Sequence, residues 1–262
     1  MLKNILVLLA LVLLGTPSAK CEDFQSQNIL VVDDENGDVL LEKNSNELTS
    51  IASLTKLMTA MVVIDSHPNL QESIRIERID VDQIKRSRSR VPVGETFTRQ
   101  ELLQLALMSS DNRAAAALAR TYPGGIAAFK LAVNRKLKSL NMAKTVIEEP
   151  TGLSTNNVST ASDLIKMATA AAKYEMIREI TTDSSDEFEI RGRAKNFHNT
   201  NRLIGQRGWN ILLSKTGFTN EAGNCLIMKI QFAKRTATLV ILNARAKSVR
   251  LRDILKIRKL LG

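Results

Sequence analysis

The order of the predicted elements indicates an α+β fold in which one antiparallel sheet carries an inserted lobe of helices. Two β-rich runs lie near the start of the chain and three near its end, while the patterns between them are mostly helical. The 262 residues, 44% of them apolar and 24% charged, suffice for one large domain with a sizeable core. We therefore expect a five-stranded antiparallel sheet flanked by helices, with an all-helical lobe at approximately residues 66–190 inserted between the sheet segments.

The first two strands are predicted on either side of a tight turn. The runs Ile29–Val32 and Val39–Leu41 flank an acidic segment in which Asn36-Gly37 is a strong hairpin signal. An apolar helical stretch, Leu57–Ile64, follows after a group of small residues.

Capping signals mark the helices of the predicted lobe. Thr98–Glu101 is a capping box, and an alanine-rich helix is expected from Arg113 to Arg120. Further helices are predicted at Phe129–Leu140 and after the cap at Thr160.

The remaining strands and a last helix close the chain. The strands are predicted at Asn210–Gly217, Asn224–Phe232 and Thr236–Asn243. The helix Ser248–Leu261 has one apolar side and several basic residues, which suits a membrane surface or, more commonly, packing against a sheet.

Residues 1–19 read as a secretory signal peptide, which leaves residues 20–262 as a single exported domain. Lys3 provides the positive charge near the start, and Ile5–Leu14 form the apolar run. Small residues follow, as expected at a cleavage site. No later segment resembles a membrane span, so we expect a periplasmic protein without a stable membrane anchor. Cys21 suggests lipidation as a minor alternative, although Lys20 stands where that signal needs a small residue.

The net charge limits the classes of binding partner, and the cysteine content raises the possibility of a disulfide bridge. The net charge of +10 suits nucleic acid, an anionic membrane or an anionic cell-wall polymer, but aromatic residues are only 4% and no nucleic-acid motif is present, so no nucleic acid is expected. The basic run Lys85–Arg90 is either a solvated loop or a contact for an anionic glycan strand. In an oxidising compartment, Cys21 and Cys225 are candidates for a disulfide bridge.

A serine and a lysine three residues apart open the first helix. Helical spacing places the side chains of Ser53 and Lys56 on one face. An amine whose pKa is lowered can take the proton of a serine hydroxyl, and the helix N-terminus suits a developing oxyanion. The pair alone is weak evidence, because a cap followed by a solvated lysine gives the same pattern.

Two more motifs strengthen that hypothesis. Ser110–Asn112 falls at the junction of two predicted helices, and Lys215–Gly217 falls on a strand of the closing sheet. With Ser53–Lys56 they make up, in order, the set found in penicillin-binding proteins and class A β-lactamases.

The chain therefore resembles low-molecular-weight penicillin-binding proteins, serine peptidases of the D-alanyl-D-alanine carboxypeptidase/endopeptidase family. The resemblance is closest to the D-alanyl-D-alanine endopeptidase (penicillin-binding protein seven) branch and covers nearly all of the chain after the signal. It implies a β-lactamase/transpeptidase-like fold. The segments that carry it are Ile51–Val63, Leu105–Ala116, Tyr122–Gly125, Glu149–Ser154 and Lys215–Asn220.

Charge and reach suggest catalytic roles with which the resemblance agrees. Ser53 is the expected nucleophile and Lys56 the general base, its pKa lowered in part by the second cation, Lys215. Ser110 is expected to relay the proton toward the leaving amine. The backbone N–H groups of Ser53 and Phe218 would form the oxyanion hole.

The other motif residues are expected to bind substrate. Asn112 would hydrogen-bond the substrate backbone, and Lys215 and Thr216 would hold a carboxylate next to the scissile bond. Gly217, which has no side chain, would let the substrate lie against the strand edge.

These assignments predict a serine D,D-peptidase that acts on peptidoglycan stem peptides through an acyl-enzyme and is inhibited covalently by β-lactams. The preferred activity is endopeptidase cleavage of D-alanyl-diaminopimelate cross-links. A carboxypeptidase that trims pentapeptides is the main alternative, and a non-catalytic peptidoglycan-binding or β-lactam-sensing module is the other. A class A β-lactamase needs a deacylating glutamate, for which Glu148 and Glu149 are the nearest candidates, but their sequence context differs from that family's.

Other chemistries fit poorly. His67 and His198 are the only histidines, and neither a Gly-x-Ser-x-Gly elbow nor a His-Glu-x-x-His motif is present. Glycine-rich nucleotide motifs are also absent, so neither a metal nor a cofactor is expected. His198 is expected in a loop beside the cleft, without an assigned role.

Overall fold

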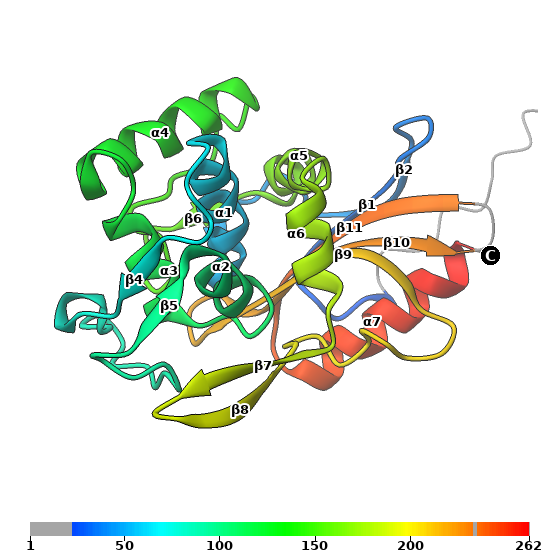
Figure 1. Ribbon diagram of the computed structural model, residues 1–262. Helices are drawn as coiled ribbons and strands as arrows, with labels where there is room; N and C mark the ends of the chain where they lie inside the picture. Colours follow the sequence, from blue (N-terminus) through cyan, green and yellow to red (C-terminus); the bar gives the residue numbers. More distant parts are fainter. Residues whose placement is uncertain (1–22, 233–234, 262) are drawn as a thin grey trace, which may run out of the picture.

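A five-stranded antiparallel sheet forms the centre of the protein. The computed structural model describes residues 23–232 and 235–261, so the predicted signal at 1–19 and Cys21 lie outside the described residues. The strands occur in the order β2-β1-β11-β10-β9, which confirms the predicted sheet (Figure 1). They are β1 (Asn28–Asp33), β2 (Val39–Lys43), β9 (Asn210–Thr219), β10 (Gly223–Phe232) and β11 (Arg235–Ala244).

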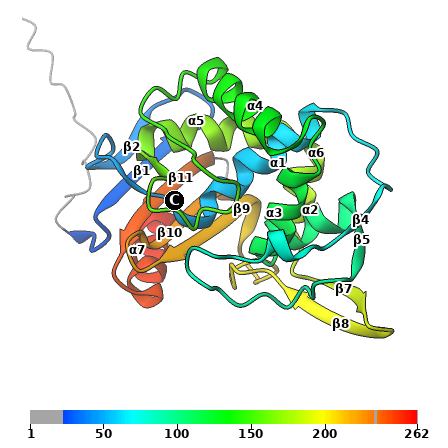
Figure 2. The same cartoon turned by 90° about the vertical axis from the view of Figure 1, so that its left-hand side faces the viewer.

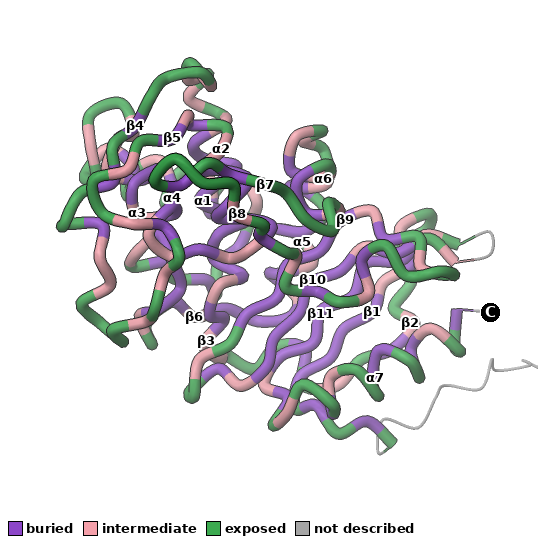
Figure 3. The backbone as a smooth tube through the Cα atoms, turned by 60° about the horizontal axis from the view of Figure 1, so that its bottom comes forward, coloured by how far each residue is buried: buried purple, intermediate pink, exposed green. Residues whose placement is uncertain are grey.

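Both faces of this sheet are covered, which explains why its central strands are mostly apolar. Side chains alternate between faces, so Ile227 joins one core with α1 (Thr55–Asp65) and α5 (Ala161–Ala171). Met228 joins the other core, under α7 (Lys247–Leu260). The last helix therefore packs on the sheet, and Figure 3 shows the central strands buried along most of their length.

Helices fill much of the chain between β2 and β9 (Figure 1). The capping box is confirmed, because Thr98 Oγ1 accepts from the Glu101 N–H at 3.1 Å and Glu101 accepts from the Thr98 N–H at 2.6 Å. A helix begins at Gly125, before the predicted Phe129. The helices besides α1, α5 and α7 are α2 (Arg99–Leu107), α3 (Asn112–Arg120), α4 (Gly125–Ser139), α6 (Glu175–Thr182) and the 3-10 turns η2 (Ala52–Leu54) and η3 (Arg78–Asp80).

Three short two-stranded sheets accompany these helices, so the segment 66–190 is not built of helices alone. The β7–β8 hairpin projects from the body of the molecule in Figure 2, and its turn has positive φ at Arg191 and Gly192. The hairpin was not predicted from the sequence because most of its side chains are exposed and polar. The pairs are β3 (Thr49–Ser50) with β6 (Val158–Ser159), β4 (Ser73–Arg75) with β5 (Thr96–Thr98), and β7 (Ser185–Ile190) with β8 (Arg193–His198).

Two findings bear on export. In the described part of the chain, no helix has the length and apolar character needed to span a bilayer. Cys225 is a free, fully buried thiol whose Sγ donates to the Ala222 carbonyl at 3.2 Å. Its predicted partner, Cys21, lies outside the described residues, so the bridge stays a prediction.

Candidate active site

Close backbone packing fixes the position of Ser53. The residue lies in η2, directly before α1, and it follows Ala52, whose φ of 46° is unusual for a residue with a side chain. A Cβ on Gly152 would lie 1.9 Å from the Ala52 carbonyl oxygen, and a Cβ on Gly217 would lie 3.1 Å from the Ser53 nitrogen. A loop and strand β9 therefore press against the serine backbone from two sides, and only glycine permits that approach.

Lys56 joins three parts of the site. Its side chain is 1% exposed, and Nζ donates to Ser53 Oγ at 2.8 Å, to Asn112 Oδ1 at 2.7 Å and to the Thr151 carbonyl at 2.7 Å. The serine is three residues earlier on the same helical face, as predicted. Asn112 opens α3, so this amine connects the first helix to the second motif.

Lys215 makes a parallel connection. The side chain is also 1% exposed, and Nζ donates to Ser110 Oγ at 2.8 Å and to the Thr216 carbonyl at 3.1 Å. Ser110 has a positive φ of 62° between α2 and α3, which turns it toward β9. The second and third motifs are therefore in direct contact.

Burial controls the charge of both lysines. It lowers the pKa of Lys56 to about 8, against the opposing attraction of Glu149 and Asp111. The pKa of Lys215 lies well below its usual value. Burial is the larger cause, and repulsion by the charge of Lys56 is the second. The sequence interpretation gave Lys215 a part in lowering the pKa of Lys56. Burial is the main cause instead, and the repulsion lowers the pKa of Lys215.

Strand β9 offers an edge beside these groups. It pairs only with β10 among the described strands, and therefore has an edge free to receive an extended peptide. Thr216 Oγ1 donates to Thr200 Oγ1 at 2.7 Å, while the Phe218 side chain is 57% exposed. The structure thus brings all eight predicted site residues into one region.

No structural role was predicted from the sequence for the loop that holds this region together. The carboxylate of Glu149 accepts the backbone N–H groups of Thr151, Gly152 and Leu153 at 2.6–2.8 Å. We call this set of hydrogen bonds the Glu149 cage. It holds in place the Thr151 carbonyl, which accepts a hydrogen bond from Lys56 Nζ. A glutamate four residues before Leu153 is too common a pattern to reveal such a cage without the structure.

The basic run forms a loop at the edge of the site. Asn112 Nδ2 donates to Ser87 Oγ at 2.9 Å, and Lys85 makes an ion pair with Glu221 in the turn after β9. The loop therefore connects the Asn112 side of the site to the end of β9.

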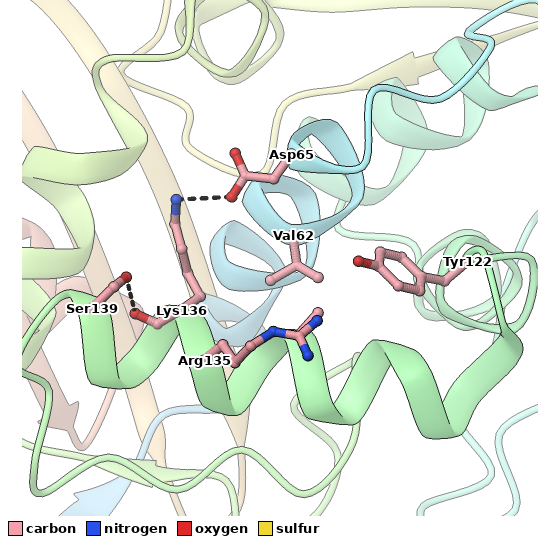
Figure 4. A pocket seen from close by; sticks show the side chains of 7 residues that line it. Val62, Asp65, Tyr122, Arg135, Lys136 and Ser139 are labelled. Carbon is pink, nitrogen blue, oxygen red and sulfur yellow. Dashed lines mark hydrogen bonds and ion pairs between the residues drawn. The ribbon is translucent and has the colours of Figure 1, made fainter.

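Two other features lie apart from these contacts. Within residues 23–232 and 235–261, no cluster of three or more His, Cys, Asp or Glu side chains is placed to hold a metal ion. A cavity of about 370 Å³ between α1 and α4 contains none of the predicted site residues (Figure 4). Its Lys136 is already paired with Asp65 at 2.9 Å.

Comparison with known proteins agrees with this arrangement. A family model described as D-alanyl-D-alanine carboxypeptidase matches residues 15–246. The chain belongs to this family. The resemblance inferred from the three motifs is thereby confirmed.

Relatives within the D-alanyl-D-alanine carboxypeptidase family include two named D-alanyl-D-alanine endopeptidase. That of Pseudomonas aeruginosa is 43% identical over 91% of this chain and 77% of its own length. That of Escherichia coli is 40% identical over 92% of this chain and 78% of its own length. The crystal structure of the Streptomyces K15 DD-transpeptidase is 25% identical and superposes with a TM-score of 0.83, covering 90% of this chain and 97% of that one.

Proposed function

We propose that this protein is a serine D,D-peptidase of peptidoglycan, specifically a D-alanyl-D-alanine endopeptidase that cleaves the cross-links between stem peptides. The observation that carries the proposal is the contact of the Ser53 hydroxyl with a buried amine whose pKa is about 8. The two endopeptidase relatives support the choice of bond.

Acylation uses the two lysine–serine contacts. Ser53 Oγ attacks the carbonyl carbon of the penultimate D-alanine while its proton passes to Lys56 Nζ, 2.8 Å away. The peptide C–N bond then breaks, and the proton reaches the leaving amine through Ser110, which Lys215 holds at 2.8 Å. The products are an ester on Ser53 and a free amine.

The substrate is held on the strand edge during these steps. The backbone N–H groups of Ser53 and Phe218 stabilise the oxyanion, because Gly217 lets β9 lie against the serine nitrogen. Lys215 and Thr216 bind the carboxylate next to the leaving nitrogen. Asn112 exchanges its contact with Ser87 for the substrate backbone.

Water then hydrolyses the ester and returns Ser53 to its free form. Glu149 is poorly suited to activate that water, because its carboxylate already accepts three backbone N–H groups. Glu148 accepts from Ser154 and Asn156 at the surface. We therefore expect β-lactams to acylate Ser53 and to be released slowly, which separates this protein from class A β-lactamases.

The activity is tested with two purified substrates, a cross-linked muropeptide dimer and a monomeric pentapeptide. An endopeptidase splits the dimer into monomers, whereas a carboxypeptidase only removes D-alanine from the pentapeptide. Loss of D-alanine with an intact dimer would favour the carboxypeptidase alternative.

The nucleophile is tested by labelling with a fluorescent penicillin. Ser53→Ala should abolish labelling and leave the thermal unfolding transition in place, because the hydroxyl is small and accepts a single hydrogen bond. A binding module would keep its affinity for peptidoglycan without either reaction.

We also propose that residues 1–19 direct export to the periplasm, where peptidoglycan is found. Fractionation of cells that produce the full chain, with mass measurement of the mature N-terminus, tests this placement. A cytoplasmic, uncleaved chain would contradict it.

A further inference from the structure

A polar hollow lies beside the candidate active site, where Thr200 lines it and contacts Thr216. A cavity of about 630 Å³ and a second of about 320 Å³ share four lining residues. We call these two cavities together the basic groove. The shared residues are Thr200, Asn201, Arg202 and Lys247.

The basic groove presents positive charge and no negative charge. Arg202 and Lys247 are exposed, and their side chains make no hydrogen bond or ion pair with any part of the chain that the structure describes. His198, the last residue of β8, contributes to the same wall. None of the residues lining either cavity is acidic.

Strand β9 sets the position of the basic groove relative to the reacting bond. Ser214 contacts Asn201 at 2.9 Å and Thr216 contacts Thr200 at 2.7 Å, so this end of the strand opens into the groove. At the other end, beyond Phe218, the ion pair of Lys85 with Glu221 spans the gap. A ligand that continues past Thr216 therefore meets Thr200 first and then reaches the groove that Arg202 and Lys247 line.

We propose that the basic groove binds the peptide on the leaving side of the cleaved bond, the acceptor stem peptide of the cross-link, through its carboxylates. The inference rests on the proposed endopeptidase function. Lys215 and Thr216 bind the carboxylate beside the leaving nitrogen, and the rest of an acceptor peptide then passes Thr200 toward Arg202 and Lys247. A carboxypeptidase releases a single D-alanine, which ends at Thr216 and leaves the groove empty.

The test removes the two free cations together. The double variant Arg202→Ala, Lys247→Ala is compared with Arg193→Ala, Lys138→Ala, a control that removes the same charge from exposed residues that line neither cavity. Three quantities are measured for each protein: kcat/KM on the cross-linked muropeptide dimer, kcat/KM on the monomeric pentapeptide, and the rate of acylation by fluorescent penicillin.

We expect kcat/KM of the groove variant on the dimer to fall about tenfold or more, because two partly exposed contacts with carboxylates are lost. Its kcat/KM on the pentapeptide and its rate of acylation by penicillin should stay within about twofold of wild type. Equal dimer cleavage by the groove variant and the control would overturn the inference. So would a parallel fall in all three rates. A wild-type enzyme that trims the pentapeptide but leaves the dimer intact would overturn the endopeptidase function itself, and the role of the groove with it.

Discussion

The proposed catalytic centre and the basic groove are joined by the contact of Thr216 with Thr200, yet they hold their positive charges in opposite ways. Lys56 and Lys215 are each 1% exposed, and every contact of their amines is defined. Arg202 and Lys247 are exposed, with no partner in the described chain. Burial lowers the pKa of both amines and fixes their geometry, which suits proton transfer. Exposure leaves the side chains of the groove cations able to adapt to a ligand, which suits recognition of a carboxylate-bearing peptide.

This difference also predicts how each region responds to change. A buried amine cannot lose its hydrogen bonds without leaving polar atoms unsatisfied, so substitutions in the centre have large effects. An exposed side chain is replaced by water at little cost, so substitutions outside the centre have small effects on folding and on acylation.

The largest effect is expected from Lys56→Met, which keeps the length of the side chain but removes the base. Acylation by fluorescent penicillin should slow by about 10³-fold, in the range that a general base contributes. Circular dichroism and thermal unfolding check that the buried methionine is accommodated. Labelling of this variant at the wild-type rate would mean that another group takes the serine proton.

Next in size is the effect of Gly152→Ala on folding. The added Cβ would lie 1.9 Å from the Ala52 carbonyl oxygen, and φ is +86° at this position. The free energy of unfolding should fall by about 3 kcal/mol or more, since backbone must move to relieve the overlap. Urea denaturation measures the change.

Gly192→Ala is the matched control for that substitution. Its φ of +67° is similar, but a Cβ there meets no atom within 4 Å. Alanine should cost only about 1 kcal/mol, the price of a left-handed conformation without a clash. Equal losses at both glycines would contradict the close packing of the loop against Ser53.

The effect of pH on the acylation rate should be smaller than the effects above, and the pKa of Lys56 predicts its direction. As the proposed base, Lys56 would accept the serine proton only when its amine is neutral, and its pKa is about 8. The rate should therefore rise about tenfold per pH unit below pH 8 and level off above it. Stopped-flow measurement of penicillin acylation between pH 6 and 9.5 tests this, and a rate that is constant from pH 6 to 8 would argue against Lys56 as the base.

The smallest effect is expected from Lys85→Ala. This substitution breaks the ion pair with Glu221 at the end of β9 opposite to the basic groove. Both side chains are partly exposed, so the acylation rate should change by less than about threefold. A tenfold fall would mean that the loop carrying Ser87 depends on this pair for its position, and would blur the distinction between buried and exposed charges.

Much of the fold was predictable because local patterns agree with the tertiary structure. Apolar strands covered on both faces and a complete capping box at Thr98 are strong local signals. Helix α6 was not predicted although Ile177 and Ile180 are buried at helical spacing, because it spans only eight residues. The β7–β8 hairpin was not predicted because its packing, such as the contact of Phe188 with Phe197 at 5.3 Å between ring centroids, joins residues of two strands. Such contacts leave no periodic trace in the sequence.

For the site, the three motifs were enough to predict the reacting groups, because a serine–lysine pair on one helical face and two further motifs are typical of one chemistry. The environment of those groups could not be predicted from the motifs. The structure assigned the low pKa of Lys56 to burial, showed the backbone N–H groups that Glu149 accepts, and placed Arg202 and Lys247 with Thr200 around one cavity. The physical reason is that burial and long-range proximity depend on the packing of distant segments, whereas a motif depends only on neighbours along the chain.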